Sequence, residues 1–143
     1  MNWIIIQAVL FGILIFLPYE ADFGIPNWLL YVGDGLIMIG FLILVRAVFD
    51  LRKSLAIAPA PKEDGQLQIH GIYGHIRHPM YVAVWLILGP GAITSGSYSK
   101  IMIFTVLVIF FIIKTRHEEK LLAGKYEGYG DYMKSVGAYI PKI

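Results

Sequence analysis

Four long apolar runs, separated by short polar segments, dominate the pattern of this chain. They cover residues 2–17, 27–49, 79–94 and 98–114. A helix needs about 20 apolar residues to cross the hydrocarbon core of a bilayer, and every backbone polar group in lipid must be satisfied within the helix. The pattern therefore predicts an all-α integral membrane bundle of about four transmembrane helices, with a kink or break at Gly89-Pro90-Gly91.

Beyond the fourth run, apolar residues recur at helical spacing among charges. Leu121, Leu122, Tyr126 and Tyr129 follow this spacing and predict an amphipathic C-terminal helix at the membrane interface. Residues 57–65 carry Pro and Gly and are expected to form a linker. The length of 143 residues is typical of a single domain.

Composition agrees with a membrane protein. The chain is 57% hydrophobic and only 15% charged, which argues against a soluble domain of this size. It has no cysteine, which excludes disulfides, a thiol nucleophile and cysteine-based metal sites. The net charge of +2 gives no argument for nucleic acid. The start, MNWIII, lacks the basic region of a secretory signal, so the first run is interpreted as a retained span.

The distribution of Lys and Arg predicts the orientation in the membrane. Residues 19–26 contain Glu20 and Asp22 but no Lys or Arg, whereas residues 50–78 and the C-terminal tail are basic. Loops rich in Lys and Arg stay on the cytoplasmic side. Both termini are therefore expected in the cytoplasm, together with two polar clusters, residues 71–81 and residues 114–120.

The first cluster reads GIYGHIRHPMY. Pro79 suits the first turn of a helix, which would place His78 beside free N–H groups at the helix N-terminus, a favourable anion site. The alternative is a basic flank and a helix start without a ligand. Tyrosines are common at membrane interfaces in any case.

The second cluster reads KTRHEEK. One of Glu118 and Glu119 is a candidate to hold ribose hydroxyls or an amino group, and Arg116 to grip a carboxylate with two hydrogen bonds. On an unbroken helix, Arg116 and Glu119 form the inward pair and Glu118 pairs with Lys114 outside. If the helix unwinds after Lys114, Glu118 is the ligand instead. The alternative to both is a solvated helical turn.

Other kinds of site are not indicated. His70, His75, His78 and His117 lack the spacing of a helical zinc pair, so no metal is expected. No Gly-rich phosphate loop follows a strand. Asp34 lies within the second run, where an acid is a functional candidate, although it is only about two helical turns from the outer end.

Together the two clusters resemble the paired signatures of the isoprenylcysteine carboxyl methyltransferase and phospholipid methyltransferase superfamily of integral membrane enzymes. The family pattern is roughly G-x-Y-x-x-x-R-H-P-x-Y, a hydrophobic helical hairpin, R-x-E-E-x-x-L and a tail with F-G-x-x-Y-x-x-Y. Ala83 stands where Gly is usual, and Tyr126-Glu127 where the tail has Phe-Gly. The resemblance covers about residues 65–141. The matching residues are Gly71, Tyr73, Arg77, His78, Pro79, Tyr81, Arg116, Glu118, Glu119, Leu122, Tyr129 and Tyr132.

The resemblance implies methyl transfer from S-adenosylmethionine to a lipophilic or small apolar acceptor, namely an isoprenylcysteine-like carboxylate, a phospholipid amine or a thiol. It implies a cofactor-binding catalytic part at residues 65–143, on the cytoplasmic side, and an N-terminal helical hairpin at residues 1–50. A sulfonium suits a tyrosine face. Arg116 and Glu119 are the expected catalytic residues. The expected cofactor-binding residues are Gln66, Leu67, Gln68, Tyr73, His78, Pro79, Met80, Tyr81 and Glu118.

The expected partners are the methyl acceptor and membrane lipids. The competing hypothesis is a small four-span transporter with Asp34 as its coupling residue. Binding of S-adenosylmethionine or its demethylated product distinguishes the two hypotheses.

Overall fold

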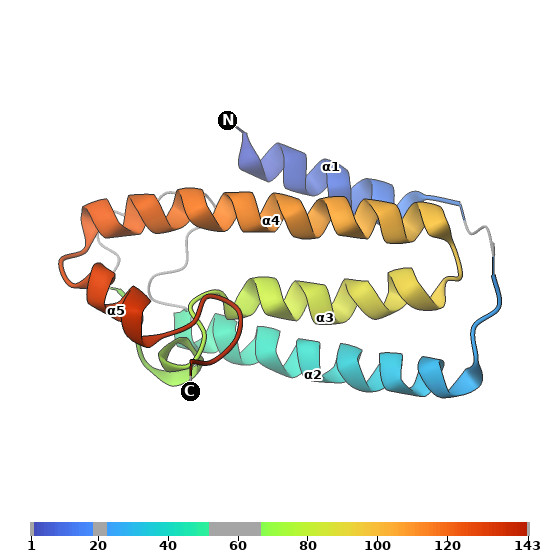
Figure 1. Cartoon of the computed structure of the whole chain (residues 1–143), viewed down its shortest axis with the longest axis horizontal. Coiled ribbons are helices and arrows are strands. Elements are labelled where there is room, and N and C mark those ends of the chain that lie inside the picture. The colour runs from blue at the N-terminus through green and yellow to red at the C-terminus, as the bar shows by residue number, and fades with distance from the viewer. Residues whose placement is uncertain (1, 19–22, 52–66, 143) are drawn as a thin grey trace.

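The computed structural model describes residues 2–18, 23–51 and 67–142, and in these it is all-helical. The helices are α1 (Trp3–Phe16), α2 (Asn27–Leu51), α3 (Pro79–Thr94), α4 (Tyr98–Lys125) and α5 (Tyr129–Ser135), with a 3₁₀ turn η1 (Gly71–Gly74). Figure 1 shows the four long helices side by side, with α5 and the C-terminal segment across one end. The predicted helical class is therefore confirmed.

Two of the helices meet the length and composition required to cross a membrane. These are α2 with 25 residues and α4 with 28 residues. The other two long helices are apolar but shorter, with 14 residues in α1 and 16 in α3. Membrane association is thus supported by α2 and α4, and the count of four spans stays a prediction.

Antiparallel packing of α2 on α3 depends on small residues seven positions apart in α2. Gly33, Gly40 and Ala47 are buried along one face. A Cβ atom at Gly40 would lie 2.8 Å from the Cβ atom of Leu86 and 3.0 Å from the carbonyl oxygen of Ala83. The two backbones therefore approach too closely for a larger residue at Gly40.

The third helix crosses Gly89-Pro90-Gly91 without a break, so of the predicted kink or break the break is wrong and the kink stays a prediction. Proline removes one backbone hydrogen bond from a helix. Here Pro90 is buried, and a Cβ atom at Gly33 would lie 3.4 Å from its Cβ atom. The proline therefore packs against α2 within a continuous helix.

The predicted amphipathic helix through Leu121 and Tyr129 is also wrong as a single element. The fourth helix continues to Lys125, and α5 starts at Tyr129 after Gly128, which has a φ of +83°. This left-handed conformation favours glycine. It turns α5 back toward the bundle, where Tyr129 is almost fully buried.

The first helix packs along α4 through aromatic contacts. The ring centroids of Trp3 and Phe110 are 5.7 Å apart, and those of Phe11 and Phe111 are 6.2 Å apart. Buried Leu14, Ala92 and Leu107 extend this core. These contacts place the start of α1 beside the charged half of α4.

Candidate functional site

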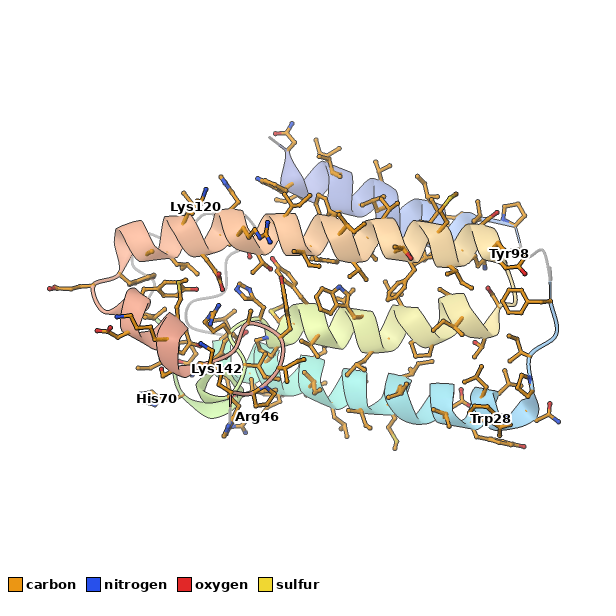
Figure 2. The ribbon with its side chains drawn as sticks, viewed as in Figure 1. Trp28, Arg46, His70, Tyr98, Lys120 and Lys142 are labelled. Atoms are coloured by element: carbon orange, nitrogen blue, oxygen red, sulfur yellow. The ribbon has the colours of Figure 1, made fainter. Side chains whose placement is uncertain are left out.

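The two polar clusters meet at one end of the bundle, where α2 ends, η1 and α3 begin, and α5 turns back (Figure 1). In Figure 2, Arg46, His70 and Lys142 lie at this end, and Trp28 and Tyr98 lie at the opposite end. Asp50 at the end of α2 fixes η1, because its carboxylate accepts a hydrogen bond from the Ile72 N–H at 2.9 Å. Gly71 has a φ of +64° and leaves no room for a Cβ atom beside Asp50.

Arg77 is the central cation of the site, and its side chain is only 9% exposed. Its Nε and Nη2 atoms lie 2.9 and 2.7 Å from Glu119 Oε1. Its Nη1 atom donates to the carbonyl oxygens of Met133 and Val136. Arg77 therefore joins the start of α3 to α4 and to the segment after α5. From the sequence alone, Arg77 was not among the predicted site residues, and a basic flank was the alternative for it. Its place in the R-H-P motif was the signal that could have identified it.

His78 shares the same carboxylate, since its Nε2 atom lies 3.1 Å from Glu119 Oε1. The predicted anion site at the start of α3 has fewer free donors than an open helix N-terminus, and it stays a prediction. Pro79 has no N–H, and the N–H groups of Tyr81 and Val82 both donate to the His78 carbonyl oxygen. Two donors of the first turn of α3 are therefore paired with His78, and the His78 ring is held by Glu119.

Glu118 forms a second polar group beside the first. The Tyr81 hydroxyl donates to both carboxylate oxygens of Glu118 at 2.6 Å. The Lys114 Nζ atom lies 3.7 Å from Glu118 Oε1 and 5.3 Å from the centre of the Tyr81 ring. It also donates to Gln7 Oε1 at 2.7 Å. Gln7 was not predicted, although it is the only amide or charged residue in α1.

The predicted orientation of these acids needs a correction. The fourth helix is unbroken, yet Glu118 faces inward with Lys114, and Arg116 is exposed. The side chains of Glu118 and Glu119 are 14% and 13% exposed. Both are covered by residues at the start of α3, because Tyr81 meets Glu118 while Arg77 meets Glu119. Lys120 points away from α3 (Figure 2).

Several buried polar atoms near this cluster have no hydrogen-bond partner among the described residues. Trp85 and Tyr139 contact each other, with ring centroids 4.7 Å apart. Tyr139 also lies beside the His78 ring, at 6.1 Å between centroids. Burial without a partner is unfavourable for such groups. The atoms near the cluster are the hydroxyls of Tyr73, Thr115 and Tyr139 and the indole N–H of Trp85. The Ser97 hydroxyl, in the α3–α4 turn at the opposite end of the bundle, also has no partner among the described residues.

The tyrosine hydroxyls of this region stay neutral at physiological pH. Burial raises the pKa of Tyr132 to about 12, and burial likewise raises the pKa of Tyr73 and of Tyr129. Burial is also the main cause of the raised pKa of Tyr139, which nearby Thr115 and Arg116 partly lower. No hydrogen bond of good geometry joins the Tyr139 and Thr115 hydroxyls. These groups can therefore act as hydrogen-bond donors.

The remaining predicted residues are placed as follows. Gln66 lies outside the described residues, and Leu67 and Gln68 are half-buried but form no strand. Tyr73 and Pro79 are buried, and Met80 is half-buried at the start of α3. A separate cavity of about 200 Å³ lies toward the α3–α4 turn, lined by apolar residues of α1 and α3, such as Leu14 and Leu88, and by Lys100 of α4.

Comparison with known proteins identifies the family to which the two polar clusters belong. The profile of the phospholipid methyltransferase family matches residues 28–128. The chain is also 30% identical over 118 residues to a methanethiol S-methyltransferase from Pseudomonas deceptionensis. The match covers 80% of this chain but only 44% of that relative, so the chain spans less than half the length of the relative it resembles. The paired Arg-His-Pro and Glu-Glu segments meet within the matched region, and the chain belongs to the phospholipid methyltransferase family, within the superfamily that includes the isoprenylcysteine carboxyl methyltransferases.

Proposed function

We propose that this protein is a membrane methyltransferase that transfers the methyl group of S-adenosylmethionine to a lipophilic or small apolar acceptor at the cytoplasmic face. The observation that carries the proposal is the group of buried, unpaired donors beside the paired acids. An unpaired buried donor costs about 1–3 kcal/mol. Several of them around one polar cluster favour a polar ligand between α3, α4 and the C-terminal segment.

The chemistry of these residues fits S-adenosylmethionine. The hydroxyls of Thr115 and Tyr139 and the Trp85 indole N–H can donate to carboxylate or ribose oxygens. The aromatic rings of Trp85 and Tyr139 can face a sulfonium. Glu118 offers acceptor oxygens for a ribose hydroxyl or an amino group. We therefore add Trp85, Thr115 and Tyr139 to the proposed binding residues, alongside Tyr73, His78, Pro79, Met80, Tyr81, Glu118 and the segment Gln66, Leu67 and Gln68.

The bound cofactor would supply an activated methyl group for direct displacement by the acceptor. The protein then needs to align the methyl group of the cofactor with the acceptor and to exclude water. We propose that Arg116, which is exposed and lies near Tyr139, faces the acceptor. We propose that Glu119 fixes Arg77 and His78 in position, because both contact its Oε1 atom.

The acceptor is proposed to be a thiol, an amine or a carboxylate. The relative is named for methanethiol, which makes small apolar thiols the first acceptors to test. A thiol or a protonated amine must lose a proton, whereas a carboxylate needs no base. Glu118 is the proposed proton acceptor for the first two, since Glu119 contacts both Arg77 and His78 at hydrogen-bond distance, whereas the nearest lysine or arginine to Glu118 in the described residues is Lys114 at 3.7 Å.

The transporter hypothesis has no support from the position of its coupling residue. Asp34 is exposed on α2, while the adjacent Gly33 faces α3. The acid therefore lies outside the packed face of α2. Among the described residues, nothing around Asp34 favours an ion path through the bundle.

The test is binding of S-adenosylmethionine and S-adenosylhomocysteine to the full chain in detergent or nanodiscs, measured by calorimetry. We expect saturable binding of both, followed by transfer of a labelled methyl group to a small thiol. His78→Ala should weaken cofactor binding by about tenfold or more, consistent with about 1.5–3 kcal/mol for a charge-assisted hydrogen bond. A folded protein that binds neither compound would contradict the proposed function.

A further inference from the structure

The first helix lies outside the family-matched residues 28–128, yet it contributes a polar contact to the site. Gln7 Oε1 accepts a hydrogen bond from Lys114 Nζ at 2.7 Å. Every other residue of α1 is apolar, aromatic or glycine. An amide in such a helix is costly unless it is hydrogen-bonded. The contact with Lys114 satisfies its carbonyl oxygen.

Lys114 lies between two acceptors at unequal distances. Its ammonium is 2.7 Å from Gln7 Oε1 and 3.7 Å from Glu118 Oε1, and its side chain is only 7% exposed. The nearer contact holds the ammonium back from Glu118. Both oxygens of Glu118 can then accept from the Tyr81 hydroxyl at 2.6 Å.

Loss of the Gln7 amide would change the position of the Lys114 ammonium between its two acceptors. A buried ammonium requires a partner, and Glu118 is the other acceptor that the described residues offer to Lys114. The ammonium would then move toward Glu118 and draw its carboxylate away from Tyr81. The orientation of Glu118 thus depends on a residue of α1.

We infer that Gln7 is a positioning residue for cofactor binding, acting on Glu118 and Tyr81 through Lys114. The inference rests on the proposed use of Glu118 in binding S-adenosylmethionine. It makes α1 a part of the site, although the family profile begins after this helix.

The experiment measures the affinity of the full chain for S-adenosylhomocysteine, which binds without turnover. Gln7→Leu removes the amide and should weaken binding about tenfold, the size of one misplaced charge-assisted hydrogen bond. In a Glu118→Gln background the same change should alter affinity less than about twofold, because the carboxylate through which Gln7 acts is absent. Gln7→Glu keeps an acceptor oxygen at the same reach and should stay within about threefold of the unmodified protein.

A matched control separates this role from simple packing. Leu14→Ala removes a buried side chain of the same helix without touching Lys114, and should lower the melting temperature while leaving affinity unchanged. Equal losses for Gln7→Leu in both backgrounds, or an equal loss in Leu14→Ala, would overturn the inference. Gln7→Met provides the same comparison if the leucine variant does not fold. If the unmodified protein binds neither S-adenosylmethionine nor its product, the proposed function fails and this inference fails with it.

Discussion

Two tyrosines near the site differ in the hydrogen bonding of their hydroxyl groups. The Tyr132 hydroxyl donates to the Tyr73 carbonyl oxygen at 2.5 Å. The Tyr139 hydroxyl is buried and has no partner among the residues that the structure describes. The first group stabilises the fold, whereas the second is available to a ligand. The same substitution at the two positions should therefore have different effects.

Tyr139→Phe should leave the melting temperature unchanged or raise it, because no hydrogen bond is lost. It should weaken S-adenosylmethionine binding by about threefold to tenfold, as expected for one neutral hydrogen bond of about 0.5–1.5 kcal/mol. Tyr132→Phe should instead lower stability by about the same amount and change affinity less. Thermal unfolding in detergent and calorimetry measure the two quantities. Equal destabilisation by both changes would show that Tyr139 has a structural partner.

At the scale of elements, the spacing between α2 and α3 is set by glycine. A Cβ atom at Gly40 would lie within 3.0 Å of the Ala83 carbonyl oxygen and of two side chains, whereas a Cβ atom at Gly35 meets nothing within 4 Å. Both residues belong to the same helix. They therefore form a matched pair for testing the helix contact.

Gly40→Ala should destabilise the protein, because α2 and α3 must separate to accept the methyl group; overpacking typically costs about 1–3 kcal/mol. Gly35→Ala should be neutral or stabilising by up to about 1 kcal/mol, the helix preference of alanine over glycine. Melting temperatures of the two variants in one detergent give the comparison. A more stable Gly40→Ala would mean that the helices are not in close contact.

At the scale of the whole molecule, the ends of the bundle differ in character. The site end carries Lys120 and most of the other basic residues, while the opposite end presents exposed Trp28 and Tyr98 (Figure 2). Tryptophan and tyrosine are enriched at membrane interfaces, and basic loops stay in the cytoplasm. We therefore expect the site end to face the cytoplasm.

The absence of cysteine from the chain allows a direct test of this orientation. Asn27→Cys and Lys120→Cys place a single thiol at opposite ends, at exposed positions. A membrane-impermeant maleimide should label Asn27→Cys in intact cells and Lys120→Cys only after the membrane is opened. Labelling of Lys120→Cys in intact cells would reverse the orientation and separate the site from the cytoplasmic cofactor of the proposed function.

The sequence by itself determined the positions of the long helices and the residues that characterise the family. The predicted third run, 79–94, has the same bounds as α3 (Pro79–Thr94). The fourth helix begins at Tyr98, where the fourth run was predicted to begin. These limits are local, because they follow from proline at a helix start and from the ends of apolar runs. The R-H-P and E-E segments could likewise be read without a structure, because their residue types and spacing are contained in the chain.

Only the tertiary structure decided which side chains meet. Helical periodicity gives the angle between Glu118 and Glu119, but it does not say that Tyr81 meets the first and Arg77 the second. The same holds for Gln7, which meets Lys114 across 107 positions of sequence. The bend at Gly128 and the continuous helix through Pro90 also depend on neighbouring elements. Such contacts depend on how the helices pack, because the partner of a buried charge is set by distance in space and not by separation along the chain.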